Sequence, residues 1–275
     1  KIENYAFCPE REDPGNKNFN IKTTSRIMAT NNEFSFQITS DVLGGCCETV
    51  FRASNVVSAE MCKLLENTHR LINISFMNEF KQYCESLSLN VHEINRLAAT
   101  KPFGYTKFEP GIGIGGHCIP VDPEYLSFKT RQIGKPVRFV ELAQEINNSM
   151  PSYVVNQVNE ILNNNKKILN NSKILLMGVA YKKDISDMRE SPAIDIAELL
   201  LDKNVDISYY DPYVEEFKVS GQIINKEVDT NSFESFDMLL VLTPHSMFAE
   251  LDFGNLKTIV FDTTGSDFIK STERI

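Results

Sequence analysis

The last hundred residues alternate short apolar runs with helical or polar segments, and this alternation restricts the possible folds more than any other feature. Four runs have the composition of buried strands: KILLMGVAY (173–181), VDISYYDP (205–212), DMLLVLTPH (237–245) and KTIVFDTTG (257–265). Continuous apolar runs of this length are typical of parallel strands that are covered on both faces. After the first run, Ser191 is a candidate helix N-cap and Pro192 suits the first helical position. We therefore predict an α/β fold, with a mostly parallel, Rossmann-like sheet and helices on both of its faces.

Residues 56–165 predict a helical region, because apolar side chains recur there at three- and four-residue steps. The longest stripe follows Ser58, a candidate N-cap, and continues to Leu87. Shorter helices are expected over 91–99, 124–133 and 137–164. An asparagine-rich joint at 163–172 separates these helices from the α/β region.

Residues 1–55 contain little periodic sequence. The stretch EREDPGNKN is polar and rich in turn-forming residues. A short strand is expected at Asn4–Cys8, and FSFQIT, Phe34–Thr39, alternates apolar and polar side chains as a strand does. These boundaries predict three parts, residues 1–55, 56–165 and 170–275.

Charge and composition exclude several classes of function. The formal net charge of −9 leaves no basic excess to neutralise nucleic-acid phosphates or an acidic membrane surface. No apolar run approaches the roughly 20 residues that span a bilayer, and KIENYAFCPE does not resemble a signal peptide. The six cysteines include no C-x-x-C pair, and neither they nor the four histidines have a metal-binding spacing. We expect mostly buried free thiols in a cytoplasmic protein, and no metal.

The segment PGIGIGGHCIPVDP, Pro110–Pro123, is the strongest candidate for a functional site. Its glycines match a dinucleotide fingerprint, but Pro110 precedes them and two prolines follow, so the required strand and helix are missing. Glycines without Cβ atoms would instead let a bulky ligand lie against the loop. Cys118 follows these glycines in a loop. From the residues alone, a role as nucleophile and a role as structural cysteine are equally well supported.

The longer segment KPFGYTKFEPGIGIGGHCIPVDPEYL resembles the active-site segment of the nucleotide-sugar 6-dehydrogenases. CPEREDPG resembles the end of their NAD-binding domain, and AEMCKLLENTHRLINISFMNE is similar to their long central helix. LMGVAYKKDISDMRESPAIDIAELL and YYDPYV resemble their C-terminal UDP-binding domain. The wording GGHCIPVDP is closer to the N-acetylhexosamine branch than to the UDP-glucose branch. The chain departs from the family in lacking most of the N-terminal NAD-binding domain, so residues 1–55 would be its remnant.

The resemblance implies a reaction chemistry. The family oxidises C6 of a UDP-sugar from an alcohol to a carboxylate in two NAD-dependent steps, through a cysteine thioester. It implies Cys118 as the nucleophile and Asp122 as a carboxylate that orders water and the lysine. Lys63 and Asn67, at i and i+4 of the long helix, would donate to the developing oxyanion, although from the residues alone a solvated polar face is favoured. Glu10 would be the base in thioester hydrolysis.

The resemblance also implies the substrate contacts. The residues that would bind the UDP-sugar are Phe108, Gly111, Gly113, Gly115 and Lys182.

Arg189 would face the cofactor, NAD. Pairing through the long helix would make a homodimer, and the uronic acid product would serve polysaccharide biosynthesis. The alternative is a truncated module that binds a UDP-sugar and dimerises without turnover.

Overall fold

The computed structural model describes residues 3–13, 16 and 18–274, and it divides into two compact units, Lys1–His69 and Arg70–Ile275. Helix α2 (Val56–Ser86) contributes residues to both units. Pro14, Gly15 and Lys17, in the stretch predicted to be rich in turns, lie outside the described residues. Each unit is considered by itself below.

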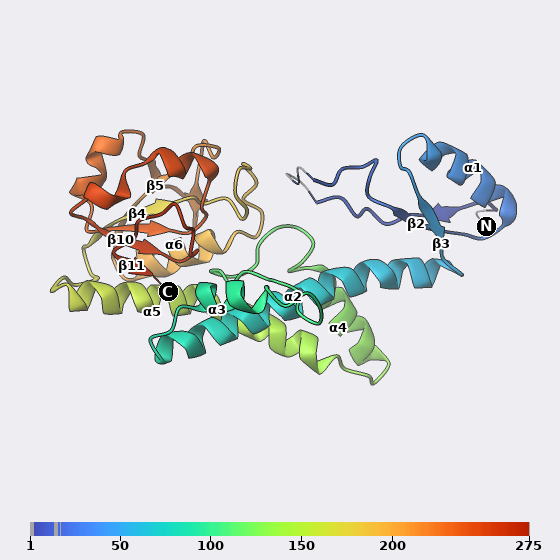
Figure 1. Ribbon diagram of the computed structural model, residues 1–275, viewed down its shortest axis with the longest axis horizontal. Helices are drawn as coiled ribbons and strands as arrows, with labels where there is room; N and C mark the ends of the chain where they lie inside the picture. The colour runs from blue at the N-terminus through green and yellow to red at the C-terminus, as the bar shows by residue number, and fades with distance from the viewer. Residues whose placement is uncertain (1–2, 14–15, 17, 275) are drawn as a thin grey trace. The chain divides into compact units, whose positions relative to one another are not determined.

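A parallel sheet forms the centre of the second unit (Figure 1). Its six described strands follow the order β11-β10-β9-β4-β5-β8, and every neighbouring pair is parallel. The strands are β4 (Lys173–Met177), β5 (Asp206–Tyr210), β8 (Asn225–Lys226), β9 (Met238–Val241), β10 (Ile259–Asp262) and β11 (Glu273–Arg274). A separate two-stranded ribbon consists of β6 (Lys218–Val219) and β7 (Gln222–Ile223). The parallel α/β fold predicted from the sequence is confirmed, with strands that end earlier than the apolar runs.

The two faces of this sheet are covered differently. Because side chains alternate along a strand, Ile174 and Leu176 pack with α5 (Arg138–Asn164) and α6 (Pro192–Asp202), which Figure 1 shows along one side of the sheet. The intervening residues Leu175 and Met177 pack against three short 3-10 segments on the other face, η1 (Thr230–Ser235), η2 (Ser246–Glu250) and η3 (Phe253–Asn255). The prediction of helices on both faces was therefore wrong for one face, because phenylalanines in these short turns are sufficient to cover it.

The helices before the sheet match the sequence pattern closely. They are α2, α3 (Val91–Ala98), α4 (Asp122–Gln132) and α5. The predicted N-cap of the long helix was wrong, because α2 begins two residues before Ser58. The side chain of Asn55 accepts a hydrogen bond from the N–H of Ser58 (2.9 Å), which is the geometry of an N-cap. Ser191 does cap α6, and Pro192 is its first residue, as predicted.

The first unit contains a three-stranded sheet and one further helix. Strand β2 (Arg26–Thr30) pairs antiparallel with β1 (Ala6–Phe7) and parallel with β3 (Val50–Arg52). The expected strand at Phe34–Thr39 was wrong, because these residues belong to helix α1 (Glu33–Gly44). Asn32 caps this helix by accepting from the N–H of Ser35 (2.8 Å), and Phe34 and Ile38 share one exposed face. In a window of only six residues, the alternation of apolar and polar side chains expected for a strand also fits this i, i+4 spacing of a helix.

All six cysteines are free thiols, as expected, but the expectation that most are buried was wrong. Cys47 and Cys84 are buried, Cys8 and Cys62 are partly buried, and Cys46 and Cys118 are exposed. Within the described part of the chain, no three His, Cys, Asp or Glu side chains are grouped to hold a metal ion. The same residues include no helix that is long and apolar enough to span a membrane.

Candidate functional site

A pocket of about 410 Å³ opens at the carboxyl edge of the sheet in the second unit. The chain runs from β4 outward to β5 and β8, and then returns to the other side of β4 to form β9. Ligands of open α/β sheets bind at such a reversal of strand order. The pocket is lined there by residues that follow β4, β9 and β10, including Ala180, Thr243 and Thr264.

The opposite wall of the pocket comes from α3 and from the loop that precedes the glycine-rich segment. Gly111, Gly113 and Lys182, all expected to bind substrate, meet in this pocket. The structure places the other two expected substrate residues elsewhere. Phe108 packs beside a small apolar cluster around Met77, and Gly115 contacts the segment from Tyr181 to Pro192.

Two buried asparagines on the long helices hold the glycine-rich loop in place. The N–H of Gly111 donates to Oδ1 of Asn78 on α2 (2.8 Å), and the N–H of Ile114 donates to Oδ1 of Asn147 on α5 (2.7 Å). Both asparagine side chains are buried. Their helices therefore fix the backbone that forms one wall of the pocket.

The last glycines of the loop are required by contact with the protein itself. A Cβ atom on Gly116, which has a φ of +90°, would lie 2.9 Å from the ring of Tyr181. On Gly115 it would lie 2.5 Å from the carbonyl oxygen of Glu190. The N–H of Gly116 also donates to the carbonyl of Arg189 (2.9 Å). The loop thus lies against the segment between β4 and α6, immediately before Cys118.

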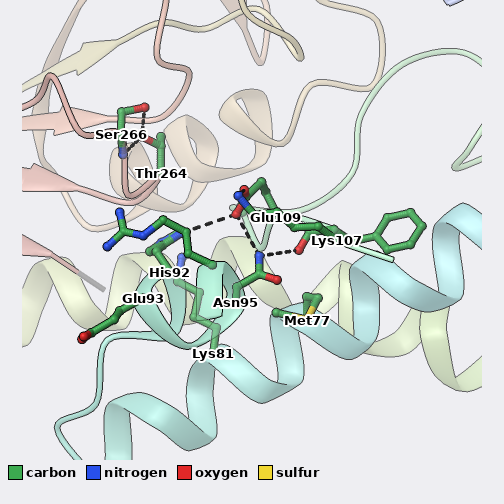
Figure 2. A network of polar contacts seen from close by, with 12 residues as sticks. Met77, Lys81, His92, Glu93, Asn95, Lys107, Glu109, Thr264 and Ser266 are labelled. Atoms are coloured by element: carbon green, nitrogen blue, oxygen red, sulfur yellow. Dashed lines mark hydrogen bonds and ion pairs between the residues drawn. The ribbon is translucent and has the colours of Figure 1, made fainter. Parts of the chain in front are cut away.

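A network of polar side chains occupies the α3 side of the pocket (Figure 2). The amide of Asn95 donates to the carbonyl of Phe108 (2.9 Å) and to the carboxylate of Glu109 (3.0 Å). Nδ1 of the buried His92 lies 3.8 Å from the same carboxylate, and Lys107 forms an ion pair with it. His92 and Lys107 together lower the pKa of Glu109 to about 2, so this side chain is a carboxylate at neutral pH.

The lining of the pocket is positively charged although the chain carries a net charge of −9. Its basic residues are Arg96, Lys107, Lys182 and Lys183, and its acidic residues are Glu109 and Asp267. Arg96 pairs with Asp267 across the pocket rim (2.9 Å). An excess of basic groups in a concave site favours an anionic ligand.

A buried histidine pins the loop that follows β4. The N–H of Asp184 donates to Nδ1 of His245 (2.9 Å), so Nε2 carries the proton and donates to Asp211 (3.0 Å). Asp211 also accepts from the N–H of Val179 (2.8 Å). Burial has the largest single effect and would raise the pKa of Asp211, but the interactions with His245 and the hydrogen bonds from backbone N–H groups together lower it. Lys182 is thereby carried on a loop that is tied to the ends of β5 and β9.

Cys118 is exposed on the turn that leads into α4. Its Sγ lies 3.9 Å from Nδ1 of His117, and its carbonyl accepts from the N–H of Asp122, the first residue of α4 (2.9 Å). The guanidinium of Arg189 is paired with Asp187 (2.6 Å), which lowers the pKa of that carboxyl group. Arg189 does not line the pocket.

The remaining expected residues, Lys63, Asn67 and Glu10, belong to the first unit. Lys63 is half-buried and Asn67 is buried, one turn apart on α2. Glu10 forms an ion pair with the buried Arg26 (2.6 Å) and accepts from two backbone N–H groups that follow it. Desolvation by neighbouring groups favours a raised pKa, but the ion pair and these hydrogen bonds together lower the pKa of Glu10.

Two family profiles match the chain on either side of the asparagine-rich joint. Residues 57–149 match the central domain of the UDP-glucose/GDP-mannose dehydrogenase family, and residues 175–267 match its UDP-binding domain. The chain belongs to this family. The pocket described above therefore contains residues from both family domains.

Relatives with assigned names agree with this placement. The chain is 32% identical over 266 residues to the UDP-N-acetyl-D-mannosamine dehydrogenase of Methanococcus maripaludis, covering 94% of this chain and 60% of the relative. It is 26% identical to the UDP-N-acetyl-D-glucosamine 6-dehydrogenase of Pseudomonas aeruginosa, with 92% and 60% covered. The solved UDP-D-ManNAc dehydrogenase of Pyrococcus horikoshii superposes with a TM-score of 0.84 at 28% identity, with 98% and 62% covered. The chain thus spans about 60% of the length of these relatives.

Proposed function

We propose that this chain supplies the UDP-sugar pocket and the reactive thiol of an NAD-dependent nucleotide-sugar 6-dehydrogenase. The substrate would be a UDP-N-acetylhexosamine, as in the names of the relatives in M. maripaludis and P. aeruginosa. The observation that carries the proposal is a basic pocket lined by Gly111, Gly113 and Lys182, with the exposed Cys118 on the same glycine-rich segment.

Cys118 is the proposed nucleophile for the aldehyde at C6. Its thiolate sulfur would form a bond to the aldehyde carbon, the carbonyl π electrons would move to the oxygen, and that oxygen would take up a proton to give a thiohemiacetal. Lys63 and Asn67 are the proposed donors to the developing oxyanion. Asp122, one turn beyond Cys118, is the proposed carboxylate that orders water, and Glu10 the proposed base for thioester hydrolysis.

NAD would accept the hydride in such a reaction, and the described residues do not provide a recognisable site for its pyrophosphate. The chain's one G-x-G-x-x-G pattern, Gly111–Gly116, follows no strand directly, and α4 starts only at Asp122. A dinucleotide fingerprint needs both neighbours. Among the described residues, Arg189 is therefore the one proposed cofactor contact.

The exposed face of α2 supports a proposed homodimer. Phe76 and Tyr83, in the part of the helix that lies in the second unit, and Leu87, in the turn directly after it, are each more than half exposed. An apolar stripe of this kind on one helix suits a two-fold contact between copies. A role in polysaccharide biosynthesis and a cytoplasmic location remain part of the proposal. The second candidate function, a UDP-sugar-binding module without turnover, would use the same pocket and the same helix.

Calorimetric titration tests the proposed pocket. The chain should bind UDP, whereas NAD should give no measurable heat under the same conditions. Binding of NAD without binding of UDP would contradict the assignment, because it would make the α/β unit the dinucleotide site. Oxidation of a UDP-N-acetylhexosamine by the protein with NAD present, and its loss in a Cys118→Ser variant, would distinguish the enzyme from the binding module.

A further inference from the structure

Lys81 on α2 is a buried charge that the proposed mechanism does not use. Its side chain has no exposed surface, and its Nζ donates a hydrogen bond to the carbonyl oxygen of Thr263 at 3.0 Å. Lysine is almost never fully buried unless it has a partner. This contact joins the long helix to the residue that immediately follows β10.

The turn that begins after Thr263 is a wall of the pocket. Residues 264–267 all line it. The N–H and the hydroxyl of Thr264 both donate to Asp262 (2.9 and 2.7 Å). Gly265 lies so close to His92 that a Cβ atom would be 2.3 Å from the imidazole. In Figure 2, Lys81 lies on α2 below His92, and Thr264 and Ser266 lie above His92.

The surroundings of Lys81 make its charge sensitive to pH. Burial lowers the pKa of Lys81 to about 8, and the carboxylates of Glu85 and Asp262 oppose that shift. Glu85 lies one turn along α2, and Glu160 on α5 is the further acidic group near it. Above pH 8 the amine becomes neutral, and its hydrogen bond to Thr263 is no longer charge-assisted, which is about a twofold weakening.

We propose that Lys81 is a positioning residue for the nucleotide pocket. Its ammonium holds the carbonyl of Thr263 and thereby fixes the turn at residues 264–267 in the arrangement that binds a nucleoside diphosphate. The identity of the ligand rests on the proposed function, but the hold on the turn does not. Loss of the charge, by substitution or by high pH, therefore weakens binding without removing any group that contacts the ligand.

Calorimetric titration with UDP at pH 7 and pH 9 tests this role. If only the protonated form is competent, the wild-type dissociation constant rises about tenfold between these values, because the competent fraction falls to about a tenth. The Lys81→Met variant cannot carry this charge at any pH, so it should bind at least tenfold more weakly at pH 7 and should lose this pH dependence. Lys129→Met, at an exposed lysine of α4, is the matched control and should behave as wild type. Ionisation of UDP itself affects all three proteins equally.

Hydrogen exchange separates failure of this inference from failure of the proposed function. The amides of Thr264 and Ser266, which donate within the turn, should exchange faster in Lys81→Met than in wild type. The wild-type amides should also exchange faster at pH 9 than at pH 7, after correction for intrinsic rates. If neither the wild type nor the two variants bind UDP, the proposed function of the pocket is wrong, and hydrogen exchange alone tests the role of Lys81. Equal UDP affinity and equal exchange in wild type and variant would overturn the inference. If the variant does not fold, the wild-type pH series decides it.

Discussion

Replacing Lys81 with methionine is expected to change how the stability of the chain depends on pH. Unfolding returns the lysine to its ordinary pKa of 10.5, whereas burial in the fold lowers the pKa to about 8. Between these two values the unfolded chain binds more protons than the folded chain. The free energy of unfolding of the wild type therefore rises with pH in this window. The Lys81→Met variant lacks the titrating group and lacks this rise.

The size of the effect follows from the displacement of the pKa. A change from 10.5 to about 8 corresponds to about 3 kcal/mol, of which about 2 kcal/mol falls between pH 7 and pH 9.5. Urea unfolding of the wild type, Lys81→Met and Lys129→Met at these two pH values measures it. The wild type should gain about 2 kcal/mol relative to Lys81→Met, and Lys129→Met should follow the wild type. The same pH dependence in all three proteins would refute the reasoning.

Further predictions concern the reactive loop and the proposed dimer. Cys118 should be alkylated faster than Cys46, the other exposed thiol, because His117 lies 3.9 Å from its sulfur; peptide mapping measures both rates, and His117→Gln should reduce the difference. Gly116→Ala should lower stability by about 1–3 kcal/mol, because alanine is strained at a φ of +90°, and thermal unfolding would show no change if this is wrong. Tyr83→Lys should shift the chain toward monomer in sedimentation, and a wild type that is already monomeric at micromolar concentration would contradict the proposed dimer.

The α/β half of the fold could be predicted because each of its signals is local. The apolar runs that became β4, β5, β9 and β10 are buried on both faces, so their composition identifies them without knowledge of their neighbours. Ser191 and Pro192 mark the start of α6 by cap geometry alone. The expected strand at Phe34–Thr39 failed for the converse reason. Six residues that alternate between apolar and polar fit the two-residue period of a strand and also the i, i+4 spacing of a helix. The N-cap hydrogen bond to Asn32 favours the helix.

The candidate site could be predicted only in part, because its walls come from segments far apart in the chain. The glycine-rich loop and Lys182 carry recognisable motifs. His92 and Arg96, by contrast, belong to a short helix whose pattern only indicates amphipathicity. Gly115 was expected to contact the substrate, and in the fold both Gly115 and Gly116 lie against the segment between β4 and α6. A glycine in the sequence indicates that a side chain does not fit at its position, but it does not indicate which neighbouring group would clash with that side chain.

Buried polar groups on the long helices explain why the pocket should respond to substitutions that never contact a ligand. The loops around the pocket carry backbone N–H and C=O groups that are partly removed from water. Leaving one of these groups without a hydrogen-bond partner costs about 1–3 kcal/mol. Asn78, Asn147 and Lys81 provide such partners from α2 and α5. A hydrophobic residue at any of these positions would suit the helix but would leave a loop group unpaired. The polar residues on the buried faces of α2 and α5 thus contribute to the shape of the pocket, and affinity for the nucleotide should depend on them as well as on the residues that line it.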